Sequence, residues 1–457
     1  MDPKAALLIA ALRRRRLARA AELATELGVS QPTLSRLVRS LQGSVLTIGR
    51  ARRTRYALTR SVRGLPVDLP VFRVDGTGRP RKQAVLHALD PEGAYLDGSP
   101  GLGWPVDGPM QEGLYPGLPY FIVDARPQGF LGRSFARQQG ARLGLPADPG
   151  RWSDDDVLAA LALAGEDLPG DLIVGEISVE AFQNRRAAGA ISWPADAREH
   201  AYQEQAMAAL RGEPPGSSAG GEFPKFTATV LDAAGIRHVI VKFSPADASP
   251  ASTRWRDVLM AEHHARAALL HLGVPAPASA IVSAGGRIFL EVSRFDRIGE
   301  HGRAGVVTLA SIEPALLGLG DVRWERAAAL LHRHGWLSAP DLRRVGLASS
   351  FGGFIGNTDM HPGNLAFLQA GPGKLALAPA YDMAPMLFAP TRAGELLERE
   401  LQPAPSPPGL EDDWHAALGA AVRYWETVAA DARISRGFRA ICAASIGRLR
   451  LAVARFG

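Results

Sequence analysis

The feature that most constrains this chain is a set of three polar residues set among predicted strands. Asp359 and Asn364 are separated by four residues, and a second acidic residue, Asp382, follows two apolar strands predicted at 365–368 and 374–377. This is the spacing of phosphotransferase active sites, where the first Asp accepts the proton of the attacking hydroxyl and the Asn and later Asp bind Mg²⁺. Turn capping would explain each residue alone, but it does not explain the set. The pattern predicts a fold that brings separate segments to one cleft.

Residues upstream of this motif add groups that suit phosphates. Gly220 and Gly221 lie in a glycine-rich run that enters a strand near Lys225, and such a loop lets backbone N–H groups approach phosphates. A second predicted strand ends with Lys242, whose ammonium can reach nucleotide phosphates from a buried position. Taken alone, Lys242 is equally consistent with a lysine at a strand edge that extends into solvent. Glu262, on a following predicted helix, could orient Lys242 or could be solvated.

The first 64 residues are far more basic than the rest. They contain 14 Lys and Arg against 3 Asp and Glu, a net charge of +11, whereas the remaining 393 residues carry a net charge of −5. Apolar spacing predicts three short helices, of which the second ends at Gly28 and the third begins after Ser30. An alternating stretch with a basic tip at 45–58 predicts a hairpin. Three helices and a basic-tipped hairpin resemble the winged helix-turn-helix domains of bacterial regulators.

A domain of this kind would bind double-stranded DNA. The polar face of its third helix would enter the major groove, and the wing arginines would hold phosphates or the minor groove. The residues concerned are Gln31, Thr33, Ser35, Arg36 and Arg39 on the helix and Arg50, Arg52 and Arg53 on the wing. A small three-helix domain can also mediate protein contacts through a solvated basic face. The charge of residues 1–64 favours the DNA-binding interpretation.

The length of 457 residues exceeds what one hydrophobic core serves, so several domains are expected. We expect a DNA-binding domain at 1–64, a second part at 65–211, an ATP-binding lobe at 212–300 and a mostly helical catalytic lobe at 301–457. Within the second part, the apolar run 120–123 reads as a strand. A helix is expected from Ser153, with the three aspartates that follow capping its first turn rather than binding a metal.

Composition places the chain among ordinary globular proteins. Hydrophobic residues make up 46% and charged residues 21% of the sequence. The single cysteine, Cys442, excludes a disulfide framework and a cysteine-based zinc cage, and it suits a reducing compartment. No stretch reaches the roughly 18 apolar residues of a membrane helix. The apolar run 5–12 precedes its arginines, the reverse of a secretion signal. We therefore expect a cytoplasmic protein that does not contact a membrane.

Together, the motifs resemble the HipA-type serine/threonine protein kinases, the toxin components of bacterial HipBA toxin–antitoxin modules. The matching residues are Ser218, Gly221, Pro224 and Lys225, then Lys242, then Arg294-Phe295-Asp296-Arg297, then Asn357-Thr358-Asp359-x-His361-x-x-Asn364, and finally Tyr381-Asp382. The run 164–170 is similar to the N-terminal subdomain of these kinases, so the resemblance covers about 65–450. It implies an α+β fold class, in which the N-terminal winged helix-turn-helix precedes a HipA-like, two-lobed, protein-kinase-like body.

Carried over by position, the resemblance implies a site for ATP and Mg²⁺. Asp359 would be the catalytic base, and Asn364 and Asp382 would bind Mg²⁺. The residues implied to contact ATP are Gly220, Gly221 and Lys225 in the phosphate loop, Lys242 on the phosphates, Phe295 at the adenine through its backbone and Asp296 near the ribose. Ser218 matches the loop serine that the family autophosphorylates, and its neighbour Ser217 leaves the modified residue open. Ser293 stands where the family often has Glu.

The function implied is that of an ATP- and Mg²⁺-dependent serine/threonine kinase, acting as a toxin with its own DNA-binding domain. Its protein substrate is unknown, and the sequence leaves open a separate small antitoxin and a homodimer. One alternative is a transcriptional regulator whose kinase-like body only senses nucleotide or binds a partner. Another is a small-molecule phosphotransferase of the aminoglycoside or choline-kinase kind. Those enzymes usually carry His before the Asp, whereas His361 follows Asp359 here.

Overall fold

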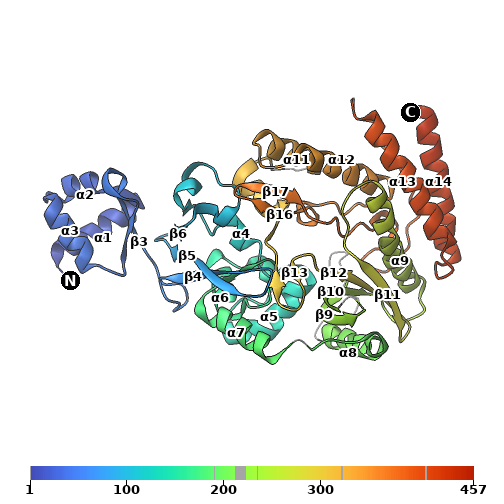
Figure 1. The fold of residues 1–457 in the computed structure, drawn as a ribbon, viewed down its shortest axis with the longest axis horizontal. Coiled ribbons are helices and arrows are strands. Elements are labelled where there is room, and N and C mark those ends of the chain that lie inside the picture. The colour runs from blue at the N-terminus through green and yellow to red at the C-terminus, as the bar shows by residue number, and fades with distance from the viewer. Residues whose placement is uncertain are drawn as a thin grey trace.

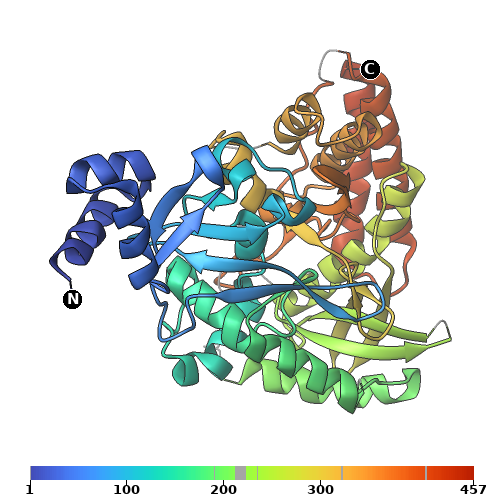
Figure 2. The ribbon, with the colours of Figure 1, turned by 60° about the vertical axis from the view of Figure 1, so that its left-hand side comes forward.

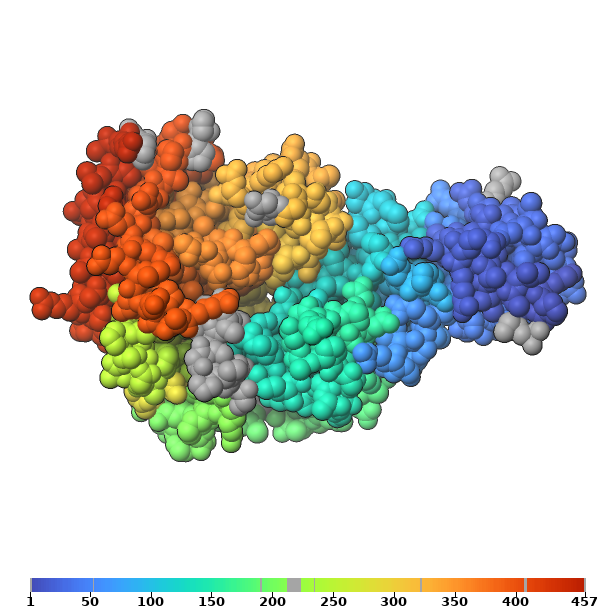
Figure 3. All heavy atoms as spheres, turned by 180° about the vertical axis from the view of Figure 1, so that it is seen from behind, coloured from blue at the N-terminus to red at the C-terminus, as the bar shows by residue number. Residues whose placement is uncertain are grey.

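The computed structural model describes residues 2–189, 191–211, 223–233, 235–320, 323–406 and 409–456. The N-terminal residues form a lobe at one end of the molecule, and the two C-terminal helices lie at the opposite end (Figures 1 and 3). Within the described ranges, no helix is long and apolar enough to cross a membrane.

The N-terminal lobe consists of three helices and a small antiparallel sheet with strand order β1-β3-β2. Its elements are α1 (Pro3–Arg15), β1 (Leu17–Arg19), α2 (Ala20–Leu27), α3 (Gln31–Ser40), β2 (Val45–Ile48) and β3 (Arg55–Leu58). The expected helix ends are confirmed, because Gly28 takes the left-handed conformation at φ 62° and the Ser30 hydroxyl accepts the amide of Thr33. Leu8, Leu23 and Leu34 lie in its buried core.

The second part of the chain is built on a five-stranded sheet, order β7-β6-β5-β4-β8. The strands are β4 (Leu69–Val74), β5 (Pro80–Ala88), β6 (Ala94–Gly98), β7 (Leu114–Tyr115) and β8 (Leu172–Val174), and the helices are α4 (Tyr120–Val123), α5 (Gly129–Leu143), α6 (Asp154–Ala164), α7 (Glu176–Ala188) and α8 (Arg198–Leu210). The strand expected at 120–123 is wrong, because these residues form helix α4; an apolar run of four cannot distinguish the two by periodicity. All three aspartates after Ser153 lie in the first turn of α6 as expected, and Asp156 forms a capping box with Ser153.

A four-stranded antiparallel sheet follows, order β11-β12-β10-β9, with helix α9 packed against it. Its elements are β9 (Lys225–Asp232), β10 (Gly235–Phe243), α9 (Pro250–His271), β11 (Ser279–Ala284) and β12 (Arg287–Ser293). Helix α8 covers this sheet and contributes Tyr202 to the same aromatic core as Phe226, Phe243 and Phe289 (Figure 2). The two central strands are therefore buried, and one of them carries Lys242.

The remaining residues form a mostly helical lobe around a short antiparallel sheet, order β15-β16-β17. Its elements are β13 (Arg297–Ile298), β14 (Gly302–Arg303), β15 (Val306–Thr308), α10 (Leu309–Ile312), α11 (Trp324–Arg333), α12 (Ala339–Phe354), β16 (Ala366–Gly371), β17 (Lys374–Leu377), α13 (Glu411–Ala430) and α14 (Arg436–Phe456). Trp425, Phe351 and Phe438 are fully buried between α12, α13 and α14. Helix α9 packs against α13, which joins the two lobes.

Candidate active site

Lys242 lies at the centre of the site. It is the penultimate residue of β10, and its side chain is only 7% exposed. Its ammonium donates to Glu262 Oε1 on α9 at 2.5 Å and also forms an ion pair with Asp382. The alternative of a lysine extending from a strand edge into solvent is excluded by this burial. Glu262 is a paired carboxylate rather than a solvated one, so its orienting role agrees with the structure.

Two ammonium groups point to the same side of the sheet. Lys225 on β9 is the direct cross-strand partner of Lys242 on β10, and directly opposed residues project from the same face. Burial lowers the pKa of Lys242, Glu262 opposes that change, and Lys225 adds to it by repulsion. Asp359 also acts on this ammonium by attraction. A polyanion placed between these cations and the carboxylates would relieve the repulsion between the two lysines.

The loop that carries Asp359 begins where α12 ends. Gly356, at φ 72°, turns the chain, and Leu387 and Phe388 pack so closely on it that an added Cβ would meet them at 3.1–3.4 Å. Asn364, in a short 3-10 turn, donates its side-chain amide to the carbonyl oxygen of Asp359 at 2.8 Å. Because that nitrogen is used by the loop, the amide oxygen is the atom of Asn364 that can serve a cation.

Asp382 lies on a separate segment with an unusual backbone. Its φ of 55° is in the left-handed region, which non-glycine residues seldom occupy and which aspartate tolerates better than most. The buried side chain of Asn357 joins this segment to the Asp359 loop, because it donates to the carbonyl of Asp382 at 3.1 Å and accepts the amide of Asp359 at 3.0 Å. The sequence interpretation gave Asn357 no role; the only signal was its place in the motif.

The predicted catalytic residues Lys242, Asp359, Asn364 and Asp382 are therefore brought together from three segments: strand β10, the Asp359–Asn364 loop and the segment of Asp382. Asn364 and Asp382 supply an amide oxygen and a carboxylate, which are hard oxygen donors of the kind that suits Mg²⁺ completed by phosphate and water oxygens. Among the described residues, no group of three His, Cys, Asp or Glu side chains forms a metal site of its own. The donor set fits a cation that arrives with a nucleotide.

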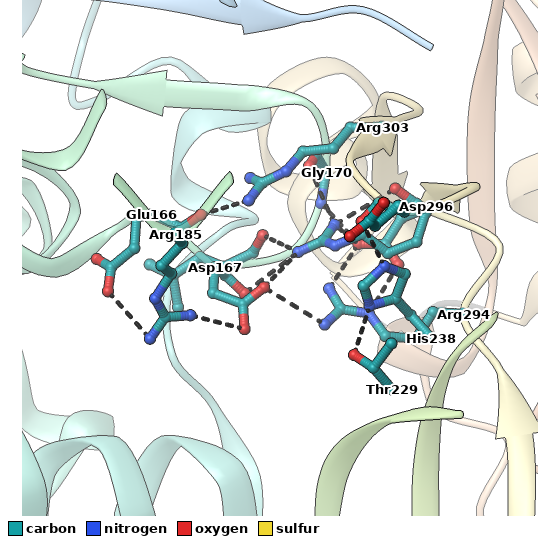
Figure 4. Close-up of polar contacts among 12 residues, drawn as sticks. Glu166, Asp167, Gly170, Arg185, Thr229, His238, Arg294, Asp296 and Arg303 are labelled. Carbon is teal, nitrogen blue, oxygen red and sulfur yellow. Dashed lines mark hydrogen bonds and ion pairs between the residues drawn. The ribbon is translucent and has the colours of Figure 1, made fainter. Parts of the chain in front are cut away.

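The turn that follows β12 carries Phe295 and Asp296. The Phe295 ring lies 5.7 Å from the ring of Tyr381, beside Asp382, so this turn adjoins the site. Asp296 is buried and accepts hydrogen bonds from Arg294 at 2.8 Å, from Arg297 at 2.6 Å and from the Gly170 amide at 3.1 Å (Figure 4). Burial opposes ionisation, but Arg294 holds the pKa of Asp296 well below its usual range. The ribose contact expected of Asp296 stays a prediction.

The glycine-rich loop residues Gly220 and Gly221, and the serines Ser217 and Ser218, lie outside the described residues. Lys225, the last residue expected of the phosphate loop, begins β9. Its cross-strand position beside Lys242 puts it at the site. The phosphate-loop and autophosphorylation assignments at 217–221 therefore remain predictions.

The residues expected to contact DNA lie on α3 and on the tip between β2 and β3. Gln31, Ser35, Arg36 and Arg39 are exposed on α3, and Thr33 is half-buried. Arg50 and Arg53 are exposed at the tip, and Arg52 lies in the 3-10 turn there.

The arginines of this lobe divide into two groups. Those at the end of α1 and on β3 pair with carboxylates: Arg15 with Glu26 at 2.6 Å, Arg16, the residue after α1, with Glu92 at 2.6 Å, and Arg55 with Glu112. Arg36, Arg39, Arg50 and Arg53, in contrast, pair with no carboxylate of the described residues. Arg19 on β1 and Lys4 on α1 pair with no carboxylate there either, so the uncompensated charge is concentrated on α3 and the tip but is not confined to them.

The fold and the site define a class. The family model of the HipA-like C-terminal domain matches residues 217–444, and that of the YjjJ-like toxin, middle domain, matches residues 65–183. The chain belongs to the HipA-type toxin family. It is 37% identical over 423 residues to Toxin YjjJ of Escherichia coli (strain K12), with 92% of each chain covered.

A solved structure of a toxin–antitoxin complex shares the fold. The HipA chain in a complex of Shewanella oneidensis MR-1 HipA, HipB and operator DNA has a TM-score of 0.50 at 14% identity, covering 85% of this chain and 97% of that one. The Helicobacter pylori proinflammatory kinase CtkA has a TM-score of 0.37 at 13% identity, covering 53% of this chain and 94% of that one. At 14% identity, the likeness to the HipA complex concerns the arrangement of elements alone.

Proposed function

We propose that this protein is a serine/threonine protein kinase of HipA type that uses ATP and Mg²⁺ and acts as a growth-inhibiting toxin. The observation that carries the proposal is Lys242, a buried lysine held between Glu262 and Asp382. This is the arrangement that phosphotransfer needs, with a cation for the phosphates, a carboxylate that orients it, and a second carboxylate for the metal.

Each group has a defined task in the transfer. The substrate hydroxyl oxygen attacks the γ-phosphorus, the bond from that phosphorus to the β-phosphate oxygen breaks, and Asp359 accepts the hydroxyl proton. Lys242 and Lys225 bind the nucleotide phosphates. Asn364 and Asp382 would hold Mg²⁺, which when bound neutralises charge on the phosphates. Nearly all of this catalysis is positioning and charge stabilisation.

The contact between Lys242 and Asp382 has a consequence for nucleotide binding. In this structure the Lys242 ammonium and the Asp382 carboxylate form an ion pair with each other. A nucleotide would take over the ammonium through its phosphates, and its cation would take over the carboxylate. The Glu262 contact holds Lys242 in place through this exchange, because Glu262 lies on the packed helix α9.

Autophosphorylation at Ser218 is part of the proposal. Ser218 precedes Lys225 by seven residues in the sequence. A phosphate dianion there would compete with the nucleotide phosphates for the same N–H and lysine donors, so modification would switch the kinase off. The neighbouring Ser217 is the alternative site of modification.

We also propose that residues 1–64 form a winged helix-turn-helix domain that binds double-stranded DNA. The support is the grouping of uncompensated arginines on α3 and the adjoining tip. These are the two elements that reach the groove and the phosphates in such domains. The related HipA chain was solved with HipB and operator DNA. For this chain, we propose DNA as the partner of the N-terminal lobe. A separate antitoxin and a homodimer remain hypotheses.

The test of the kinase proposal is transfer of ³²P from ATP to the protein itself and to proteins of a cell lysate. Wild type is expected to label, and Asp359→Gln and Asp382→Gln are each expected to abolish labelling while remaining folded. Asp412→Asn, an exposed carboxylate on α13, is the matched control and should label as wild type. Unchanged labelling in either active-site variant would refute the assignment.

A regulator whose body only senses nucleotide would give the opposite pattern. It would shift its own promoter DNA specifically in electrophoresis and bind ATP, yet transfer no phosphate.

The DNA-binding proposal is tested by replacing Arg36. Arg36→Ala should lower the slope of log affinity against log salt concentration by about one unit, because one phosphate contact is lost. Arg14→Ala is the control, since that side chain already pairs with Glu26.

A further inference from the structure

A loop from the second part of the chain is bound to the turn that follows β12. This loop, residues 165–171, lies between α6 and β8. Its Gly170 amide donates to Asp296 of the turn, which is 126 residues later in the sequence. Arg297 donates to the carbonyl oxygen of Leu168 at 3.0 Å and to that of Asp167 at 3.2 Å. Arg303, on β14, donates to the carbonyl oxygen of Glu166 (Figure 4). We call residues 165–171 the clamp loop and residues 294–297 the hinge turn.

The charges at this contact do not balance without the clamp loop. Three arginine side chains, Arg294, Arg297 and Arg303, are at most 8% exposed. The hinge turn itself supplies one buried carboxylate, Asp296. The second carboxylate is Asp167 of the clamp loop, 3.2 Å from Arg297 and 4.0 Å from Arg294. Asp171 of the same loop is buried and also attracts Arg303, but it is paired with Arg73 at 2.8 Å. Without Asp167, the three arginines would therefore have Asp296 as their one ion-paired carboxylate among the described residues.

The electrostatic effects agree with this count. Burial opposes ionisation of Asp167, yet Arg294 and Arg297 outweigh it and lower the pKa of this carboxyl. Burial, and then repulsion from Arg297, lowers the pKa of Arg303 to about 9, and its Nη1 is buried without a partner among the described residues. The cluster is therefore short of negative charge even with Asp167 present. The Asp167 side chain is 49% exposed, so solvent screens part of the effect of removing it, and the rest falls on the two buried arginines that it contacts.

The hinge turn is the segment that would meet the adenine. Among the described residues, the backbone amide and carbonyl of Phe295 have no hydrogen-bond partner, whereas the neighbouring Arg294 amide donates to the carbonyl oxygen of His238 at 2.9 Å. His238 belongs to β10, the strand of Lys242. The position of Phe295 is set by its flanking arginines, and the clamp loop holds these in turn.

We propose that Asp167 is a positioning residue for nucleotide binding: through Arg294 and Arg297 it holds the hinge turn in the conformation that presents the Phe295 backbone to adenine. This inference rests on the proposed kinase function, and it gives the second part of the chain a role in that function. Asp167 itself does not touch the nucleotide.

The experiment compares Asp167→Asn with Glu166→Gln, the same change at the neighbouring residue. Glu166 is the control because its carboxylate pairs only with the exposed Arg185, at 3.4 Å, among the described residues. Hydrogen exchange of peptides covering 293–298 needs no nucleotide. Asp167→Asn is expected to speed exchange there about tenfold, equivalent to about 1.4 kcal/mol of local stability. Glu166→Gln should leave it unchanged, and Asp167→Glu should restore it.

Nucleotide measurements then test the positioning role. In ³²P transfer, Asp167→Asn should raise KM for ATP at least tenfold while kcat stays within about twofold, because the reacting end of the site is intact. Binding of a fluorescent ATP analogue should weaken in parallel. Exchange at 293–298 equal to wild type, or an unchanged KM despite faster exchange, would overturn the proposal. A wild type that binds no nucleotide would instead refute the kinase function, while hydrogen exchange still decides whether the clamp loop holds the hinge turn.

Discussion

Replacement of Glu262 tests the buried ion pair at the centre of the site. Glu262→Leu leaves the Lys242 ammonium in a position where its side chain is 7% exposed, with Asp382 as its remaining ion-pair partner. Removal of one partner of a buried pair costs about 3–5 kcal/mol. Because Asp382 still contacts the ammonium, the lower end, about 3 kcal/mol, is expected. For a cooperative unit of about 150–250 residues, that lowers Tm by about 6–12 °C.

The assay is thermal unfolding followed by circular dichroism, together with ³²P transfer. The double variant Lys242→Met/Glu262→Leu separates charge from packing, because it removes both charges and should recover most of the lost stability. It should nevertheless transfer no phosphate, since Lys242 is absent. Glu262→Leu with wild-type Tm, or a double variant no more stable than the single one, would refute the interpretation of this pair as a buried, mutually dependent unit.

Three further expectations follow from individual side chains. Burial raises the pKa of Cys442 to about 12, so iodoacetamide at pH 8 should leave the native protein unmodified and label it only on unfolding; rapid native labelling would contradict this burial. Asn357→Ala should lower kcat about a hundredfold with KM for ATP little changed, because the Asp359 and Asp382 segments lose their link; equal kcat would show that the link is dispensable. Hydrogen bonds from Ser249 lower the pKa of Asp247 to about 2. This carboxylate therefore stabilises the fold above its ordinary pKa of about 3.8 and loses that effect as pH falls towards 2, so Asp247→Asn should flatten acid unfolding monitored in that range.

Much of the site could be predicted because several of its residues lie close together in the sequence. Asp359 and Asn364 lie on one loop, so their proximity follows from the sequence alone. Lys242 at the end of an apolar strand and Glu262 on the next helix gave a plausible pair, and the structure joins them at 2.5 Å. The Ser30 cap and the acidic first turn after Ser153 could be predicted for the same reason, since both are local features of the sequence.

What could not be predicted depends on distant partners. Arg294 and Arg297, which pair with Asp296, are its neighbours in the sequence. The Gly170 amide and Asp167, in contrast, reach this cluster only through tertiary contact, and no sequence pattern marks them as its partners. Helix α4 (Tyr120–Val123) could not be predicted either. It is short and almost entirely buried, so its residues show no apolar periodicity that would distinguish a helix from a strand. Asn357 bridges two loops that meet only after folding.

The most direct test of the central claim is Mn²⁺-dependent binding of a non-hydrolysable ATP analogue, measured by isothermal titration on wild type, Asn364→Ala and Asp382→Asn. Mn²⁺ takes the same oxygen ligands as Mg²⁺. Wild type should bind the metal–nucleotide complex at one site, and each variant should lose the metal-dependent part of the affinity. Metal-dependent binding that is the same in all three proteins would contradict the account.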